Sequence, residues 1–139
     1  MIRNYLSLIK FSHTAFALPF AIIGYLLALH DTSQHVAQTL PELGLILICM
    51  VSTRTAAMSF NRYIDRVFDA NNPRTANREI PSGIITPTGA LLLTILSSVI
   101  FLITTWFINP LCFMLAPVAL LITLGYSYTK RFTWLCHFV

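Results

Sequence analysis

Four long apolar runs, separated by short polar segments, constrain the fold of this chain more than any other feature. The runs cover residues 14–30, 43–60, 84–108 and 111–126 of 139. Each is close to the roughly 20 residues that an α-helix needs to cross about 30 Å of hydrocarbon. Only 10% of the residues are charged, whereas a soluble domain usually carries about 25%. We therefore expect an all-α integral membrane protein with four transmembrane helices. The soluble, disordered and nucleic-acid-binding classes fit poorly.

Local signals mark where these helices begin and bend. Thr86-Pro87 and Asn109-Pro110 each place a capping side chain before a proline at the first helical position. Pro19 and Pro117 fall inside apolar runs, where we expect them to kink helices that their neighbours still stabilise. An amphipathic start over residues 1–13 is expected to extend the first helix.

The loops predict the orientation in the membrane. Of the nine Lys and Arg residues, eight fall on one alternating side of the predicted spans and none on the other, and Arg54 lies inside a span. Lys and Arg are enriched in cytoplasmic loops. We therefore expect an inner (cytoplasmic) membrane location in which the amino terminus and the loops at residues 61–83 and 127–133 are cytoplasmic.

The last residues of the chain are apolar again. Residues 132–139 follow the basic pair Lys130 and Arg131, and eight residues are too few to cross a bilayer. We interpret them as the start of a fifth span. Residues 1–139 are then expected to be the amino-terminal part of a single, longer transmembrane domain.

Most of the polar chemistry lies in one segment. More than half of the charged residues, which number nine Lys or Arg and five Asp or Glu in the whole chain, lie between Arg54 and Glu79. If residues 52–70 form a continuous helix, 100° per residue places four polar side chains within an arc of about 80°. These four are Arg54, Asn61, Asp65 and Asp69. A functional site is therefore predicted at the end of the second span.

Asp65 and Asp69 are one helical turn apart, about 6 Å along the helix axis. Two carboxylates at this spacing repel each other by a few tenths of a kcal/mol in water. The repulsion is greater at a membrane boundary unless a cation lies beside them. Hard oxygen ligands on one helix face, with water in the remaining positions, suit Mg²⁺ bridged to a phosphate better than zinc. The pair therefore favours a Mg²⁺ site.

Simpler interpretations of the same segment stay open. Arg62 and Arg66 are spaced to pair with the two aspartates in a salt-bridged helix end. Arg54 lies inside the span, where an ionised side chain costs on the order of 2.5–3.5 kcal/mol. It can snorkel toward the cytoplasm, or it can face the carboxylates and bind an anionic substrate.

Two further segments carry groups that suit phosphate. The loop at residues 71–83 contains arginines, which form phosphate-binding forks, and turn residues that can fold it over the helix end. Tyr126 and Lys130 are one helical step apart at the end of the fourth span and could supply a hydroxyl and an ammonium group. The alternative for the loop is a solvated, positively charged segment. The alternative for Tyr126 and Lys130 is an aromatic side chain at the membrane interface with a lysine that sets the topology.

Three segments resemble one family. Residues 54–69 resemble the first Asp-rich motif of the UbiA family of intramembrane aromatic prenyltransferases, in the branch similar to 4-hydroxybenzoate polyprenyltransferase. Residues 72–83 are similar to the loop after that motif, and residues 126–131 to the family's Tyr-x-x-x-Lys segment. The residues that carry the resemblance are Arg54, Asn61, Asp65, Asp69, Thr75, Arg78, Pro81, Gly83, Tyr126 and Lys130. The resemblance implies a nine-helix UbiA-type bundle with two facing Asp-rich motifs, of which this chain has the first.

The resemblance also implies roles for single residues. Asp65 and Asp69 would hold Mg²⁺ against a polyprenyl diphosphate. Asn61 would hydrogen-bond to the diphosphate, and Arg78 and Lys130 would balance its charge. Arg54 would contact either the diphosphate or the carboxylate of the acceptor, with Tyr126 near the reacting groups.

The implied function is transfer of a polyprenyl group to an aromatic acid in ubiquinone or menaquinone biosynthesis. The acceptor would be 4-hydroxybenzoate or a naphthoate, and the lipid bilayer would be a partner but nucleic acid would not. We expect this chain by itself to be inactive. The alternative is an ion or solute transporter half-domain with its charged residues as an ion path. Such a half-domain predicts broken helices or an inverted repeat, and the spans are not visibly related to one another.

Overall fold

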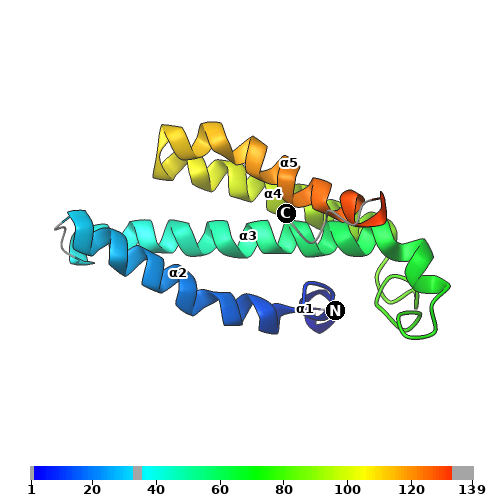
Figure 1. Cartoon of the computed structure of the whole chain (residues 1–139). Coiled ribbons are helices and arrows are strands. Elements are labelled where there is room, and N and C mark those ends of the chain that lie inside the picture. The colour runs from blue at the N-terminus through cyan, green and yellow to red at the C-terminus, as the bar shows by residue number, and fades with distance from the viewer. Residues whose placement is uncertain (1, 33–35, 133–139) are drawn as a thin grey trace.

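The computed structural model describes residues 2–32 and 36–132, and this part of the chain contains helices and loops but no strand (Figure 1). In chain order the helices are α1 (Ile2–Leu8), α2 (Phe11–Thr32), α3 (Val36–Ala70), α4 (Pro87–Ile108) and α5 (Pro110–Phe132). The prediction of an all-α fold is therefore confirmed. The proposed start of a fifth span, residues 132–139, lies almost wholly outside the described residues.

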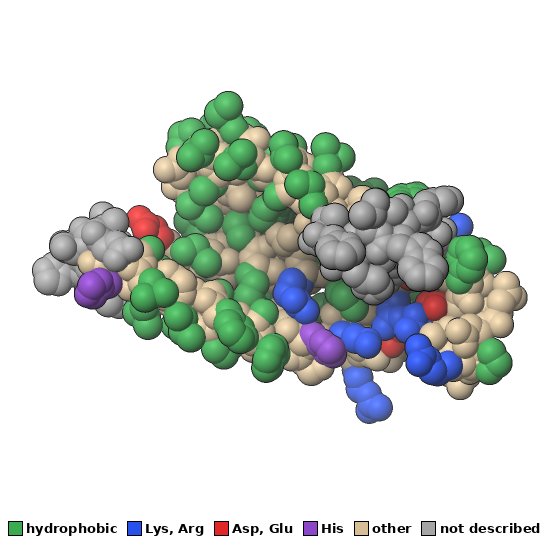
Figure 2. All heavy atoms as spheres, in the orientation of Figure 1, with side chains coloured by type: hydrophobic (Ala, Val, Ile, Leu, Met, Phe, Trp, Pro, Cys, Tyr) green, Lys and Arg blue, Asp and Glu red, His purple; other side chains and the backbone are tan. Residues whose placement is uncertain are grey.

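Four helices are long and apolar enough to cross a membrane. Their apolar parts are Phe11–His30, Thr39–Ala70, Pro87–Ile108 and Pro110–Thr129. Large hydrophobic side chains are exposed along them, as expected for surfaces that face lipid rather than water. Examples are Phe16, Phe20, Leu92, Trp106 and Leu121. Figure 2 shows these apolar surfaces over most of the bundle, with Lys and Arg side chains gathered toward one end. The four predicted transmembrane helices are confirmed.

The helix ends follow the predicted capping signals. The Thr86 side chain accepts a hydrogen bond from the Gly89 backbone N–H at 3.1 Å at the start of α4. The Asn109 Oδ1 atom accepts from the Leu111 N–H at 2.8 Å at the start of α5. Each cap precedes a proline, which lacks an N–H and therefore leaves no unsatisfied donor there. Pro19 and Pro117 lie inside α2 and α5.

The central element is α3, which contacts all four other helices and packs most extensively against α4. Ser59 and Thr94 meet at this interface with their hydroxyl oxygens 2.9 Å apart, and both residues are buried. Ala56 and Ala90 are fully buried. Small side chains let helix backbones approach closely in a membrane, where packing rather than the hydrophobic effect drives association. This interface fixes the position of the end of α3.

A hydrophobic cluster attaches the amino terminus to the loop after α3. The cluster is formed by the buried side chains of Leu8, Ile9, Ile80, Ile85 and Ala90. A hydrogen bond of 2.5 Å from the Ser7 hydroxyl to Glu79 Oε1 adds a polar contact. Gly83 ends the loop with φ 76°, a conformation that glycine adopts without steric cost. The loop is therefore held between α1 and α4.

Candidate functional site

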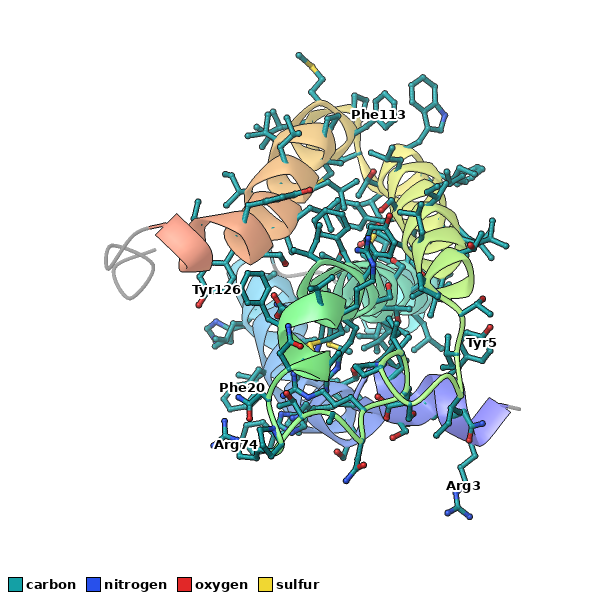
Figure 3. All side chains as sticks on the ribbon, turned by 90° about the vertical axis from the view of Figure 1, so that its right-hand side faces the viewer. Arg3, Tyr5, Phe20, Arg74, Phe113 and Tyr126 are labelled. Atoms are coloured by element: carbon teal, nitrogen blue, oxygen red, sulfur yellow. The ribbon has the colours of Figure 1, made fainter. Side chains whose placement is uncertain are left out.

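The predicted site lies at the carboxyl end of α3. Because α3 is continuous from Val36 to Ala70, the prediction of one helix through residues 52–70 is confirmed. Helix geometry then places Arg54, Asn61 and Asp65 on one face, with Asp69 at its edge. Tyr126 lies on α5 beside this end of α3, and Arg74 lies in the loop at the same end of the molecule (Figure 3).

Asp69 is buried beneath the loop and forms an ion pair with Arg78. The Arg78 Nη1 atom donates to Asp69 Oδ1 at 2.7 Å and to Oδ2 at 2.8 Å. The Asp69 side chain is 9% exposed and that of Arg78 is 32% exposed. A charge-assisted pair of this kind is short and stronger than a neutral hydrogen bond. Of the sequence-predicted residues, Asp69 and Arg78 are thus in direct contact.

Hydrogen bonds within the loop bring Arg78 back over the helix end. The Thr75 hydroxyl donates to the Asp69 carbonyl oxygen at 3.0 Å. The Asn72 Oδ1 atom accepts from the Arg74 N–H at 3.0 Å, the local pattern by which Asn favours turns. The Asn72 carbonyl also accepts from the Thr75 N–H at 2.9 Å. The loop therefore folds over the helix end, as its turn residues predict.

Arg62 is buried in the same region, being only 7% exposed. It interacts electrostatically with Asp65, Asp69, Arg78 and Glu79. Within the described part of the chain, its Nε atom has no hydrogen-bond partner. The sequence interpretation of Arg62 as part of a salt-bridged helix end gave no sign of this burial. Arg66 instead lies over the Tyr63 ring, 4.4 Å from the ring centroid, and donates to the Tyr63 carbonyl at 2.7 Å.

Asn61 and Tyr126 line one cavity between α3 and α5. Its volume is about 320 Å³, and it is lined by Ala57, Met58, Asn61, Ile122, Thr123, Tyr126 and Ser127. The lining is mostly apolar, with the Asn61 amide and three hydroxyl groups as its polar contributions. Asp65 lies one helical turn beyond Asn61 and is half-buried. The structure therefore brings two predicted residues from different helices into one cavity.

Arg54 is separated from the aspartates along α3. It is half-buried, and its Nε atom is enclosed without a hydrogen-bond partner in the described residues. Arg54 precedes Asp65 by 11 residues, which on a straight helix separates the two residues by about 16 Å along the axis. The Lys130 side chain, the remaining sequence-predicted group, lies outside the described residues.

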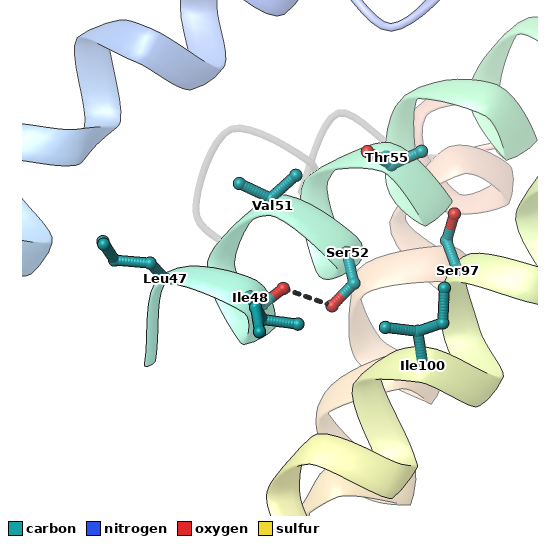
Figure 4. A pocket seen from close by; sticks show the side chains of 7 residues that line it. All are labelled: Leu47, Ile48, Val51, Ser52, Thr55, Ser97 and Ile100. Atoms are coloured by element: carbon teal, nitrogen blue, oxygen red, sulfur yellow. Dashed lines mark hydrogen bonds between the residues drawn. The ribbon is translucent and has the colours of Figure 1, made fainter. Parts of the chain in front are cut away.

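A second cavity lies between α3 and α4. Its volume is about 350 Å³ and it is lined by Leu47, Ile48, Val51, Ser52, Thr55, Ser97 and Ile100 (Figure 4). The Ser52 hydroxyl donates to the Ile48 carbonyl at 2.7 Å, as the dashed line in Figure 4 shows. This cavity is apolar and offers no charged group for an anionic ligand.

The donor atoms at the end of α3 fit a hard divalent cation. Two carboxylates one turn apart and a nearby amide oxygen supply ligands of the type that Mg²⁺ prefers, with water or phosphate oxygens in the other positions. No group of three or more His, Cys, Asp and Glu side chains suited to a metal occurs in residues 2–32 and 36–132. A metal here would therefore depend on ligands beyond these two carboxylates. Asp69 would also have to exchange Arg78 for the metal.

The fold and this polar end define an integral membrane protein with a charged site at one end of a helical bundle. Residues 17–139 match the model of the UbiA prenyltransferase family. The chain belongs to this family, and the resemblance found in its sequence motifs is confirmed.

Individual relatives agree with the family match. The chain is 32% identical over 102 residues to a 4-hydroxybenzoate octaprenyltransferase of Vibrio cholerae serotype O1, a match that covers 71% of this chain and 36% of the relative. It is 36% identical over 95 residues to the enzyme of the same name from a Janthinobacterium species, covering 66% and 34%. The chain thus spans about a third of the length of the curated relatives that it matches.

A solved structure shares the fold. The apo structure of a UbiA homolog from Aeropyrum pernix K1 matches with a TM-score of 0.79 and 33% sequence identity. The match covers 91% of this chain and 44% of the homolog. The helices of this chain are therefore arranged like those of a UbiA protein over nearly their whole length.

Proposed function

We propose that this chain forms part of a metal-dependent aromatic prenyltransferase, which transfers a polyprenyl group from its diphosphate to an aromatic acid such as 4-hydroxybenzoate. The observation that carries the proposal is the pair Asp65 and Asp69 at the end of a membrane-spanning helix, with Arg78 in contact with the second carboxylate. The names of the matched relatives support the substrate class. Family membership favours this function over the transporter alternative.

The residues of the chain have separate tasks in this proposal. Asp65 and Asp69 would hold Mg²⁺, and Asn61 and Arg78 would bind the diphosphate, with Lys130 as a further cation. A bound Mg²⁺ would neutralise the leaving diphosphate as its C–O bond ionises. The electron pair of that bond leaves with the diphosphate, and an allylic cation remains. A ring carbon of the acceptor then forms the new bond to the allylic carbon, and its proton passes to the released diphosphate.

The surroundings of the site suit these substrates. The mostly apolar cavity beside Asn61 and Tyr126 would keep water from the cation, while Arg54 would bind either the acceptor carboxylate or the diphosphate. A polyprenyl tail is lipid-soluble, so a site at the end of a transmembrane bundle lets the tail stay in the bilayer. We propose that this end is cytoplasmic in the inner membrane, because the basic residues gather there. Residues 1–139 then belong to one nine-helix domain acting in quinone biosynthesis.

The experiment is an assay of a hybrid enzyme. In the hybrid, residues 1–139 replace the corresponding segment of the Vibrio cholerae relative. Membranes that contain the hybrid are incubated with octaprenyl diphosphate, Mg²⁺ and radiolabelled 4-hydroxybenzoate. We expect a prenylated acid that disappears when EDTA replaces Mg²⁺. A hybrid that inserts and elutes as a monodisperse protein, but yields no prenylated acid, would contradict the proposal.

A further inference from the structure

The contact between Arg78 and Asp69 poses a problem for metal binding. A single nitrogen of Arg78 lies 2.7 and 2.8 Å from the two oxygens of Asp69, so the donor covers both atoms that a metal would use. The carboxylate is 9% exposed, and a buried charge needs a partner to offset its lost hydration. Arg78 is that partner in the structure described here.

The surrounding charges make Arg78 the group that can leave. Arg62 and Arg78 repel each other, and both are attracted to Asp69. Arg62 extends from a continuous helix and is only 7% exposed, whereas the Arg78 side chain is 32% exposed and extends from a loop. When a divalent ion approaches Asp69, the added positive charge repels both guanidinium groups. The Arg78 side chain, being the more exposed of the two, can turn toward solvent.

The loop itself can stay in place while the side chain turns. Glu79, the next residue, accepts a hydrogen bond from Ser7 of α1 at 2.5 Å. Ile80 is buried in the cluster with Leu8, and the Thr75 hydroxyl is bonded to the backbone of Asp69. The Arg78 backbone is thus anchored on both sides. Reorientation needs side-chain rotation alone, which is fast and breaks little structure.

We propose that Arg78 is an exchangeable counter-ion: it neutralises Asp69 while no metal is bound, and it moves to the diphosphate when a metal takes the carboxylate. This inference rests on the proposed function and adds a form of regulation to the same site. A metal alone must displace Arg78 without giving it a new partner. When diphosphate is also present, the released guanidinium gains one. Metal and diphosphate therefore strengthen each other's binding, as reciprocal linkage requires.

The test measures metal binding directly. Mn²⁺ is titrated into the hybrid enzyme, with this chain either unaltered or substituted, in detergent micelles, and free Mn²⁺ is followed by its EPR signal. Without diphosphate, Arg78→Gln should bind Mn²⁺ about fivefold more tightly than the unaltered chain, because no ion pair has to open. Arg78→Lys, which keeps the charge on a more strongly hydrated ammonium group, should fall between them.

A control variant separates the effect of the direct contact between Arg78 and Asp69 from the effect of removing one positive charge from the loop. Arg74 lies on the same loop and is exposed, so Arg74→Gln removes an equal charge. It should change the Mn²⁺ affinity less than about twofold. Inorganic pyrophosphate, with correction for its own Mn²⁺ complexes, should raise the affinity of the unaltered chain and raise that of Arg78→Gln much less.

Several results would overturn the exchange. An unchanged or weaker Mn²⁺ affinity in a folded Arg78→Gln variant would do so, and so would an equal gain in Arg74→Gln. If the unaltered chain binds Mn²⁺ but Arg78→Gln binds it no more tightly, the exchange is wrong and the metal assignment of the proposed function survives. If neither the unaltered chain nor Arg78→Gln binds Mn²⁺, the exchange and the metal assignment fail together.

Discussion

At the scale of single residues, Arg54 combines a charged group with a half-buried position in α3. Its Nε atom is enclosed within the bundle without a partner in the described residues, and an enclosed unsatisfied donor of a charged group is costly. That cost is offset if an anionic substrate group binds there. A guanidinium that only snorkels toward water has no such need.

Substitution separates the two interpretations of Arg54. Arg54→Leu makes the span more apolar and easier to insert, so insertion of the hybrid enzyme should stay the same or improve. Prenyl transfer should fall by about 100-fold or more if Arg54 binds substrate. Transfer rates and the inserted fraction are measured on the same membranes. Retained transfer at normal insertion would count against a substrate role.

Part of the site follows from the sequence and part does not. The alignment of Asn61, Asp65 and Asp69 needs only a helix period, and α3 supplies it. The burial of Arg62 beneath a loop depends on how distant segments pack. The contact between Ser7 and Glu79 joins residues 72 positions apart, and no local pattern in one sequence encodes such a pair. Sequence patterns therefore do not mark Glu79 as a site residue, although it anchors the loop that carries Arg78.

At the scale of helices, α3 extends well past its apolar run. The run over residues 43–60 is the expected span, and α3 continues through the polar residues to Ala70, in line with the helix predicted over residues 52–70. Its 35 residues give a length of about 52 Å, well beyond the hydrocarbon thickness. Hydropathy marks where the lipid ends, whereas the helix continues because Ile64, Asp69 and other residues of its last turns are buried against the protein.

The amino terminus, by contrast, departs from the sequence prediction. Residues 1–13 were expected to extend the first helix, yet α1 ends at Leu8 and α2 begins at Phe11. Lys10 lies between them with φ 47°, a left-handed conformation that interrupts a helix. The break lets α1 turn onto the loop, where Leu8 is completely buried. The tertiary contact with Ile80 and Ile85 thus overrides local helix propensity.

This attachment can be tested by comparing two leucines of α1. Leu8 is 0% exposed and Leu6 is 41% exposed. Leu8→Ala should lower the free energy of unfolding by about 2–4 kcal/mol, because it leaves a cavity in a closed cluster. Leu6→Ala should lower it by less than about 1 kcal/mol. Thermal unfolding in detergent compares them. Equal losses of stability in the two variants would contradict the proposed packing. So would a loop that protease cuts no faster in Leu8→Ala than in the unaltered chain.

At the scale of the whole molecule, the chain carries one pair of carboxylates spaced by a helical turn. The sequence contains five Asp or Glu residues, and only Asp65 and Asp69 have this spacing. A diphosphate carries several negative charges, and a single carboxylate pair supplies few of the ligands that Mg²⁺ requires. Four helices also give limited shelter from water to an allylic cation.

We therefore predict that residues 1–139 expressed alone insert in membranes but do not transfer a prenyl group. Membranes that contain the chain and membranes that contain the hybrid enzyme are assayed side by side with radiolabelled 4-hydroxybenzoate. Membrane extraction and immunoblotting establish equal insertion. Transfer at the rate of the hybrid would refute this prediction and would indicate that a second copy of the chain completes the site.

The central claim is that the carboxylates at the end of α3 support metal-dependent prenyl transfer. The most direct measurement is the transfer rate of the hybrid enzyme with Asp65→Asn and, separately, Asp69→Asn. Asparagine keeps the size of each side chain but removes the charge that a metal needs. Both variants should insert normally and lose at least about 100-fold in transfer rate at saturating Mg²⁺. Transfer within a factor of two of the unaltered hybrid in both variants would contradict the claim.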